Sequence, residues 1–122
     1  MKALSADLTG LCSLALDDAA LDRLAWRAYG EGVRLAKLAR EGEGGIVLYR
    51  VDGDAPRDAF LPHTHTGGEA YFVLRGVIAD ETGRYEAGSF VWLPPGSSHR
   101  PWCEGGTVVL VLWPRGVAIA QE

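Results

Sequence analysis

Apolar and polar residues alternate along short stretches of this chain from Val33 onward, the period expected when successive side chains point to opposite faces of a strand. The alternation begins at residues 33–35, and residues 46–51 are rich in the types that strands favour. Turns containing Gly or Pro separate the stretches, and residues 43–45, Glu-Gly-Gly, are expected to form the first of them. Many short strands joined by close turns predict an all-β barrel or double-sheet sandwich. Further strands are expected at residues 59–61, 63–65, 70–74, 77–79, 89–93 and 107–113.

Two segments depart from simple alternation. Residues 14–27 contain Asp17 and Asp18, either of which could cap a short helix with one apolar side. Residues 108–112 are apolar at every position, so both faces of that strand are expected to be buried. One face would lie inside the barrel and the other against something outside it. A subunit interface is the obvious candidate for the outer face.

All three histidines fall in two short blocks of the sequence. His63 and His65 belong to HTHTGGE, and His99 follows a Pro-Pro-Gly turn. On a strand, His63 and His65 point to the same face, and the Thr-Gly-Gly after them lets the backbone turn before Glu69. A neighbouring antiparallel strand could bring His99 to the same place. The pattern predicts one metal site with His63, His65, Glu69 and His99 as ligands.

These blocks, HTHTGGE and GSFVWLPPGSSH, together resemble the two-part signature of the cupin superfamily. The segments ADETGRYEAGSF and PPGSSHRPW are similar to the ChrR-like cupins, a branch that includes relatives of acetylacetone-cleaving dioxygenases. The resemblance runs from about residue 26 to residue 113. It implies one jelly-roll (double-stranded β-helix) domain over residues 1–122, with a core barrel at about residues 26–116 and a short helical or irregular N-terminal segment.

The ligand set suits several divalent metals. Three imidazoles and a carboxylate fit Zn, Fe, Mn, Ni or Cu, and the sequence does not choose among these ions. Glu69 either binds the ion or hydrogen-bonds a histidine or a bound water, and the short gap after His65 favours ligation. Aromatic residues are expected to wall a pocket beside the ion, although core packing is the simpler role for several of them. They are Tyr71, Phe90, Trp92 and Trp102.

Composition narrows the functional classes. The 122 residues carry a net charge of -4, and the basic residues are scattered, which argues against nucleic-acid binding. The N-terminal apolar run is too weak for a signal peptide or a membrane span, so a cytoplasmic location is expected. Cys12 and Cys103 are far apart, and free, buried thiols are expected rather than a disulfide.

Two functions compete. The first is a metal-dependent dioxygenase acting on a small dicarbonyl-like substrate, as the resemblance to the dioxygenase relatives implies. The second, implied by the ChrR-like branch, is a non-catalytic sensor of a metal or small molecule. No histidine precedes His63, so the zinc-binding segment attached in anti-sigma factors is not expected, and a sensor would need a separate partner. A structural metal is a third possibility. The expected partners are a small-molecule ligand and a second copy of the chain, because single-domain cupins commonly dimerise through their sheets.

Overall fold

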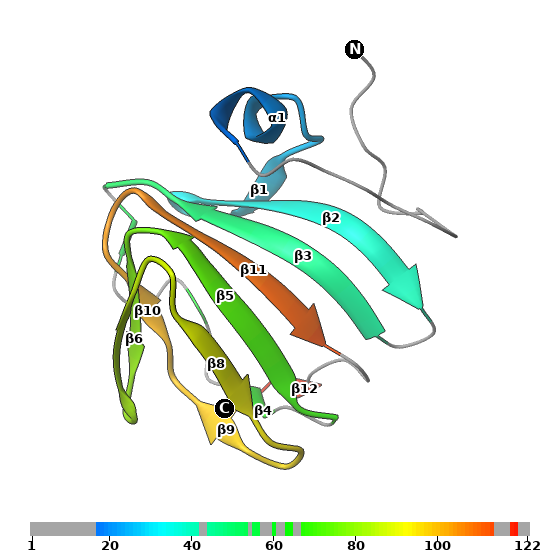
Figure 1. Cartoon of the computed structure of the whole chain (residues 1–122), viewed down its shortest axis with the longest axis vertical. Helices are drawn as coiled ribbons and strands as arrows, with labels where there is room; N and C mark the ends of the chain where they lie inside the picture. The colour runs from blue at the N-terminus through cyan, green and yellow to red at the C-terminus, as the bar shows by residue number, and fades with distance from the viewer. Residues whose placement is uncertain are drawn as a thin grey trace.

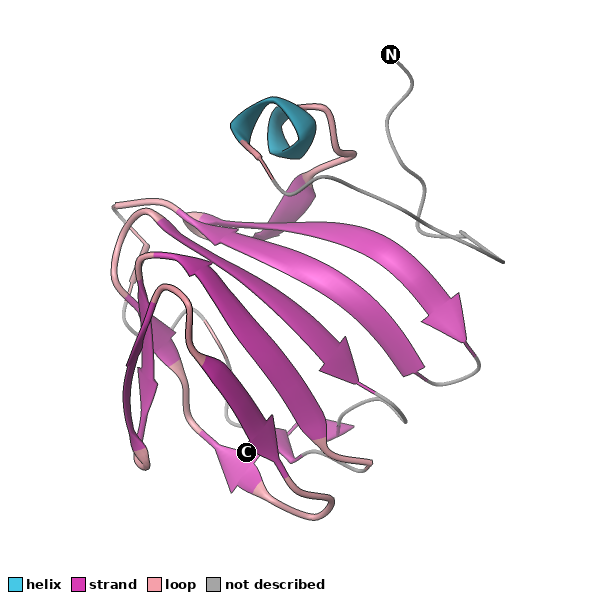
Figure 2. Cartoon of the chain, in the orientation of Figure 1, coloured by secondary structure: helices cyan, strands magenta, loops and turns pink. Residues whose placement is uncertain are grey.

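A computed structural model describes residues 17–41, 44–53, 55–56, 60, 63–64, 67–113 and 118–119. Strands make up most of this part of the chain, and one short helix lies at its N-terminal end (Figure 2). The helix, α1, spans Asp18–Asp22, and its cap is Asp17, whose side chain accepts a hydrogen bond from the backbone N–H of Ala20 at 2.9 Å. In the described residues, no helix is long and apolar enough to cross a membrane.

The main layer is a curved, six-stranded antiparallel sheet (Figure 1). Its strand order is β1-β2-β3-β11-β5-β8, so the last long strand of the chain is inserted between β3 and β5. This insertion joins distant parts of the sequence into one sheet. The strands are β1 (Arg27–Gly30), β2 (Val33–Glu41), β3 (Gly44–Val51), β5 (Glu69–Arg75), β8 (Phe90–Leu93) and β11 (Thr107–Trp113).

Two three-stranded sheets complete the fold. One has the order β10-β6-β7 and the other the order β12-β4-β9, and every pairing in both is antiparallel. Together with the large sheet they make an all-β jelly roll, the predicted fold class. The strands are β4 (His63–Thr64), β6 (Val77–Asp80), β7 (Gly83–Glu86), β9 (Ser98–His99), β10 (Trp102–Cys103) and β12 (Ala118–Ile119).

The concave face of the large sheet carries the main core. Alternate residues of each strand point inward, as the period-two pattern requires, and they pack with Ile78 of β6 and with Phe60. Val73, Val109 and Tyr71 are at most 1% exposed. The fold therefore encloses its apolar side chains between the large sheet and the smaller ones.

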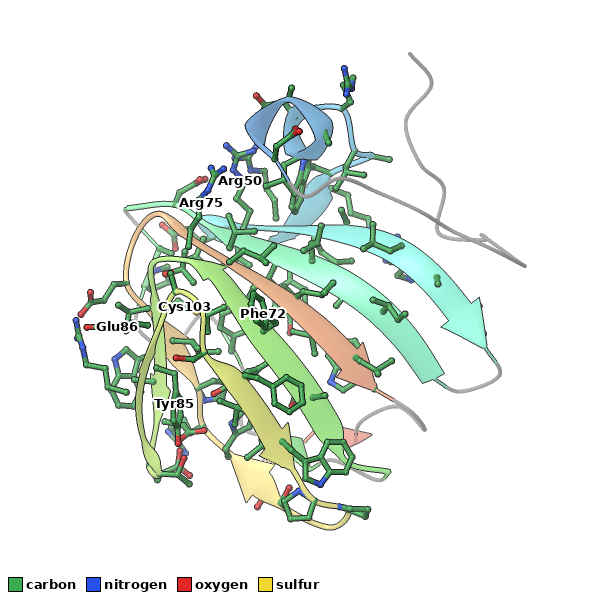
Figure 3. The ribbon with its side chains drawn as sticks, viewed as in Figure 1. Arg50, Phe72, Arg75, Tyr85, Glu86 and Cys103 are labelled. Carbon is green, nitrogen blue, oxygen red and sulfur yellow. The ribbon has the colours of Figure 1, made fainter. Side chains whose placement is uncertain are left out.

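The convex face of the same sheet is only partly covered. Leu21 of α1 and Leu24, just after the helix, pack over Leu48 and Val108, on the part of the sheet formed by β2, β3 and β11. Farther along, Phe72, labelled in Figure 3, stands on the outer face of β5 and is 39% exposed. Within the described part of the chain, the apolar strand at residues 108–112 is thus covered from outside at one end only.

Several expected boundaries differ from the structure. The short helix expected within residues 14–27 is confirmed at Asp18–Asp22, with Asp17 as its cap, but residues 23–26 lie beyond it and β1 begins at Arg27. Gly44 and Gly45, expected in a turn, are the first residues of β3. Residues 83–86 form a strand that the turn-rich sequence did not suggest. The strand expected at residues 59–61 lies largely outside the described residues.

Candidate metal centre and the adjoining cavity

The two histidine blocks lie side by side in the smallest sheet. Strand β4 pairs with β9, and the register sets His63 opposite His99 and Thr64 opposite Ser98. Residues directly opposite each other in an antiparallel pair share a face of the sheet. The position of the His63 side chain and the whole of His65 fall outside the described residues.

Glu69 comes to the same place from the large sheet. It opens β5, at a position with the inward parity of Tyr71 and Val73, and is only 4% exposed. His99 is also 4% exposed, and its Nε2 lies 3.5 Å from Oε2 of Glu69. Two of the four expected ligands thus meet in a buried position although thirty residues separate them in sequence.

A second carboxylate, which the sequence analysis did not single out, contacts the other nitrogen of this ring. Oδ2 of Asp80 lies 2.9 Å from Nδ1 of His99, and Asp80 is 5% exposed. Its Oδ1 accepts hydrogen bonds from the backbone N–H of Thr82 at 2.7 Å and from the Thr82 hydroxyl at 2.5 Å. One carboxylate therefore holds both the β6–β7 turn and the imidazole.

A signal for Asp80 exists in the sequence, though it is weak. Asp80 stands two residues after the inward-facing Ile78, so a continued strand would point both side chains into the barrel. An aspartate two residues before Thr82-Gly83 is also a common turn residue, which is the simpler interpretation. The structure shows that Asp80 serves both purposes.

Burial and close charges determine the ionisation of this cluster. Burial disfavours the protonated form of His99, but its contacts with Glu69 and Asp80 outweigh burial and raise the pKa of the ring above its usual value. Burial opposes the charged form of Asp80, yet the bonds from Thr82 and His99 leave the pKa of Asp80 below its ordinary value. The pair therefore favours a negatively charged Asp80 beside the ring.

The donors that the structure describes fit a divalent ion. Atoms that share an ion at about 2.1 Å stand roughly 3.0 to 3.4 Å apart at octahedral or tetrahedral angles. The 3.5 Å between Nε2 of His99 and Oε2 of Glu69 is close to that spacing. Metal-binding histidines also usually donate their other N–H to a carboxylate, the position that Asp80 occupies. Within the described part of the chain, no group of three or more side chains already forms a complete ion-binding cluster.

A cavity of about 260 Å³ opens beside this cluster, on the concave side of the large sheet. Glu69 and His99 line one part of it. Its walls are mainly apolar and aromatic, which is typical of small-molecule sites. The aromatic residues are Tyr29, Tyr49, Phe60 and Trp113, and Tyr49 contacts each of the other three rings, with centroids 5.2, 5.1 and 6.2 Å away respectively.

The four aromatic residues expected to wall a pocket lie elsewhere. Phe90 and Trp92 are on the outer face of β8, where they are 66% and 49% exposed, because their strand parity is opposite to that of Val91 and Leu93. Tyr71 lies in the core, and its hydroxyl is buried without a hydrogen-bond partner among the described residues. Trp102 is half-buried on β10, whereas its neighbour Pro101 lines the cavity.

Cys103 is a structural rather than a reactive thiol. It packs against the main core, and Figure 3 shows it on the side of the molecule formed by β6 and β10. Burial raises the pKa of Cys103 to about 12, so its nucleophilic thiolate is scarce near neutral pH. Cys103 forms no disulfide among the described residues, and Cys12 lies outside them.

Solved structures share this architecture. The chain aligns with the crystal structure of Rhodobacter sphaeroides SigE in complex with the anti-sigma ChrR at 33% identity and a TM-score of 0.63, covering 76% of this chain and 50% of that one. An acetylacetone dioxygenase from Acinetobacter johnsonii aligns with a TM-score of 0.73 over 100% of this chain and 86% of that chain. The identity there is 13%, so this second likeness concerns the fold alone.

The sequence comparisons agree with the first of these structures. The anti-sigma-E factor ChrR of Cereibacter sphaeroides is 36% identical over 86 residues, which are 70% of this chain and 39% of that protein. The chain therefore spans less than half the length of that relative. Residues 18–116 match the family described as the ChrR cupin-like domain. With its jelly-roll fold and its clustered histidine blocks, this chain belongs to the ChrR cupin-like family.

Proposed function

We propose that this chain is a metal-binding sensor module that acts through a protein partner. The observation that carries the proposal is the buried series Asp80, His99 and Glu69, which holds one imidazole between two carboxylates at the edge of a cavity. His63 and His65 would complete the ligand set with His99 and Glu69. When bound, a divalent ion would supply a Lewis acid at the cavity wall.

The residues of this chain perform the remaining tasks. Asp80 orients the His99 ring and favours the tautomer with the proton on Nδ1, which leaves Nε2 as the donor atom. The mainly apolar walls leave few polar groups around the donors, which strengthens electrostatic interactions there. The β6–β7 turn fixes Asp80 through Thr82, so the support is rigid.

Metal stoichiometry tests the first half of this proposal. Protein purified without added metals is analysed by plasma mass spectrometry, beside His63→Ala, His65→Ala and His99→Ala variants and an Asp52→Asn control on the surface. We expect about one divalent ion for each wild-type chain and for the control, and a large loss in the three histidine variants. Variants that keep the full amount of metal while remaining folded would contradict the site.

The sensor role is inferred from the family of this chain and from the binding of ChrR to a sigma factor. The structure named above holds ChrR with SigE, and we infer that a sigma factor is the class of partner for this module. A panel of purified sigma factors that includes SigE is titrated by calorimetry with the metal-loaded and the metal-free protein. We expect binding whose Kd changes at least tenfold on metal removal. Equal Kd values for the two forms would contradict sensing, and no binding would contradict the partner class.

A dioxygenase is the second candidate, favoured by the cavity that adjoins the donors. Its substrate would be a small dicarbonyl-like compound that binds beside the ion. An oxygen electrode with Fe(II)-loaded protein and acetylacetone separates the two functions. Sustained oxygen uptake that the His99→Ala variant abolishes would favour the enzyme, and its absence would favour the sensor.

A further inference from the structure

Two cationic side chains stand on the inner face of the large sheet, where the other strands place apolar residues. Lys37 has the inward parity of Val33 and Leu35 on β2, and Arg27 on β1 lies directly opposite Leu35. Both line the cavity, and both are exposed to solvent at its mouth. Among the described residues, neither makes an ion pair with a carboxylate.

One wall of the same cavity carries an indole whose N–H lacks an acceptor in the described part of the chain. Trp113 lines it, and the Nε1–H of this indole is buried without an acceptor among the described residues. An indole N–H can only donate, and a buried donor without an acceptor is unfavourable unless a ligand or water accepts its hydrogen bond. As far as the described residues show, the cavity thus offers two positive charges without a carboxylate partner and a set of aromatic walls, and one of these walls holds the unpaired indole N–H.

Charged residues that point inward also protect the edges of sheets against pairing with other chains. Edge protection explains Arg27, because β1 is an edge strand. It also explains Lys37, because that residue lies on the part of β2 that extends past β1 and is itself a sheet edge. Edge protection requires neither a cavity beneath the charges nor an unpaired indole. The coincidence of all three features favours a ligand over edge protection alone.

From these features we propose that the cavity binds a small organic acid. Its carboxylate would lie at Arg27 and Lys37, and its apolar body would lie among Tyr29, Tyr49 and Phe60, beside the Trp113 indole. The small volume of the cavity restricts the ligand to about the size of one ring with short substituents. This inference deepens the proposed function, because it names the ligand class of the same cavity.

Benzoate and its neutral isostere benzamide test the proposal on the full chain. Isothermal titration calorimetry compares the wild type with Arg27→Gln/Lys37→Gln, and with Arg23→Gln, which removes an exposed cation at the end of α1. We expect benzoate to bind at least tenfold more tightly than benzamide. The double variant should lose this preference and keep its weak benzamide binding, and Arg23→Gln should behave as the wild type does.

The outcomes separate the proposal from its alternatives. Equal Kd values for benzoate and benzamide, no binding of benzoate at millimolar concentration, or wild-type benzoate binding by the double variant would each overturn it. Edge protection predicts only more aggregation in the double variant, which light scattering measures. The comparison of benzoate with benzamide uses the wild-type protein alone, so this test does not depend on whether the variants fold.

The same titration is repeated on metal-free protein. Arg27 and Lys37 lie outside the cluster of Asp80, His99 and Glu69, so a preference for benzoate survives there even if no metal binds. Loss of metal stoichiometry with intact benzoate binding therefore overturns the metal site alone. Intact metal stoichiometry without benzoate binding would overturn the proposed ligand class alone.

Discussion

Asp80 shows how one side chain can connect a turn to a binding site. Its two oxygens have separate partners, Thr82 in the β6–β7 turn and His99 in β9. A buried carboxylate is favourable only when its oxygens are hydrogen-bonded, and both oxygens of Asp80 are. The local turn therefore stabilises the charge that orients the ring.

Replacing Asp80 with Asn should weaken metal binding without unfolding the protein. The amide keeps the shape of the side chain but removes its negative charge, and loss of such a supporting carboxylate typically costs about 10- to 100-fold in metal affinity. Competition with a chelator measures the Kd for Zn(II). The Asp52→Asn variant, which alters an exposed pair with Arg34, should bind as the wild type does. Equal affinities of Asp80→Asn and the wild type would contradict this role.

Cys103 should react slowly with thiol reagents. Because burial raises its pKa to about 12, only a very small fraction is thiolate at pH 8, and alkylation should be at least about 100-fold slower than that of free cysteine. Iodoacetamide labelling of a Cys12→Ser variant, followed by mass spectrometry, measures the rate. Unfolding in guanidinium should restore the ordinary rate, whereas fast labelling of the folded chain would show an exposed thiol.

At the scale of elements, the connection between β5 and β6 depends on one glycine. Gly76 has a φ of +74°, which L residues rarely adopt, and a Cβ there would lie 2.7 Å from Cα of Thr107 on β11. Thr107 is fully buried, accepts a hydrogen bond from the N–H of Val77 at 2.9 Å and donates one to the carbonyl of Glu104 at 2.6 Å. Because Gly76 has no Cβ, the β5–β6 turn packs closely against β11.

Gly76→Ala should therefore destabilise the fold strongly. Backbone strain costs about 1 kcal/mol, and the clash with Thr107 adds roughly 1 to 3 kcal/mol. Gly88→Ala is the matched control, since Gly88 has a φ of +92° but nothing within 4 Å of the added Cβ. Urea unfolding measures the free energies of both variants. Similar losses in both would mean that strain, and not the contact, determines the cost.

At the scale of the whole molecule, the residues that the structure describes leave the outer face of the sheet partly uncovered. Beyond the reach of α1, four large apolar side chains with 39 to 66% exposure lie on β5, β8 and β11, with no charged residue among those that line the shallow groove beside them. A contiguous apolar surface of this kind marks an association site. The exposed residues are Phe72, Phe90, Trp92 and Leu112.

The homodimer expected from sequence stays a prediction, and this surface is where we expect it to form. A second copy presents the same uncharged, apolar strip, so two strips can bury each other about a two-fold axis. Analytical ultracentrifugation should show wild-type dimers that Phe90→Ser/Trp92→Ser converts to monomers. Tyr29→Ser removes an exposed aromatic residue of edge strand β1 and should leave the dimer intact. A monomeric wild type at tens of micromolar concentration would contradict the prediction.

The sequence by itself determined the strand-rich fold class, because period-two alternation and Gly or Pro turns are local features. It also identified the two histidine blocks, since HTHTGGE and PPGSSH match a recognisable family pattern. It did not determine which aromatic residues face inward. Phe90 and Trp92 lie on the same face of β8. The pairing of β8 with β5 decides which way this face points, and it points outward.

Only the tertiary structure decided which residues support and line the site. Asp80, Glu69 and His99 come from three separate strands, and their contacts depend on how the small sheets close over the large one. The inward positions of Arg27 and Lys37 likewise follow from strand register, which no single segment encodes. Local sequence specifies alternation, but long-range pairing chooses the face, and the face determines what each side chain contacts.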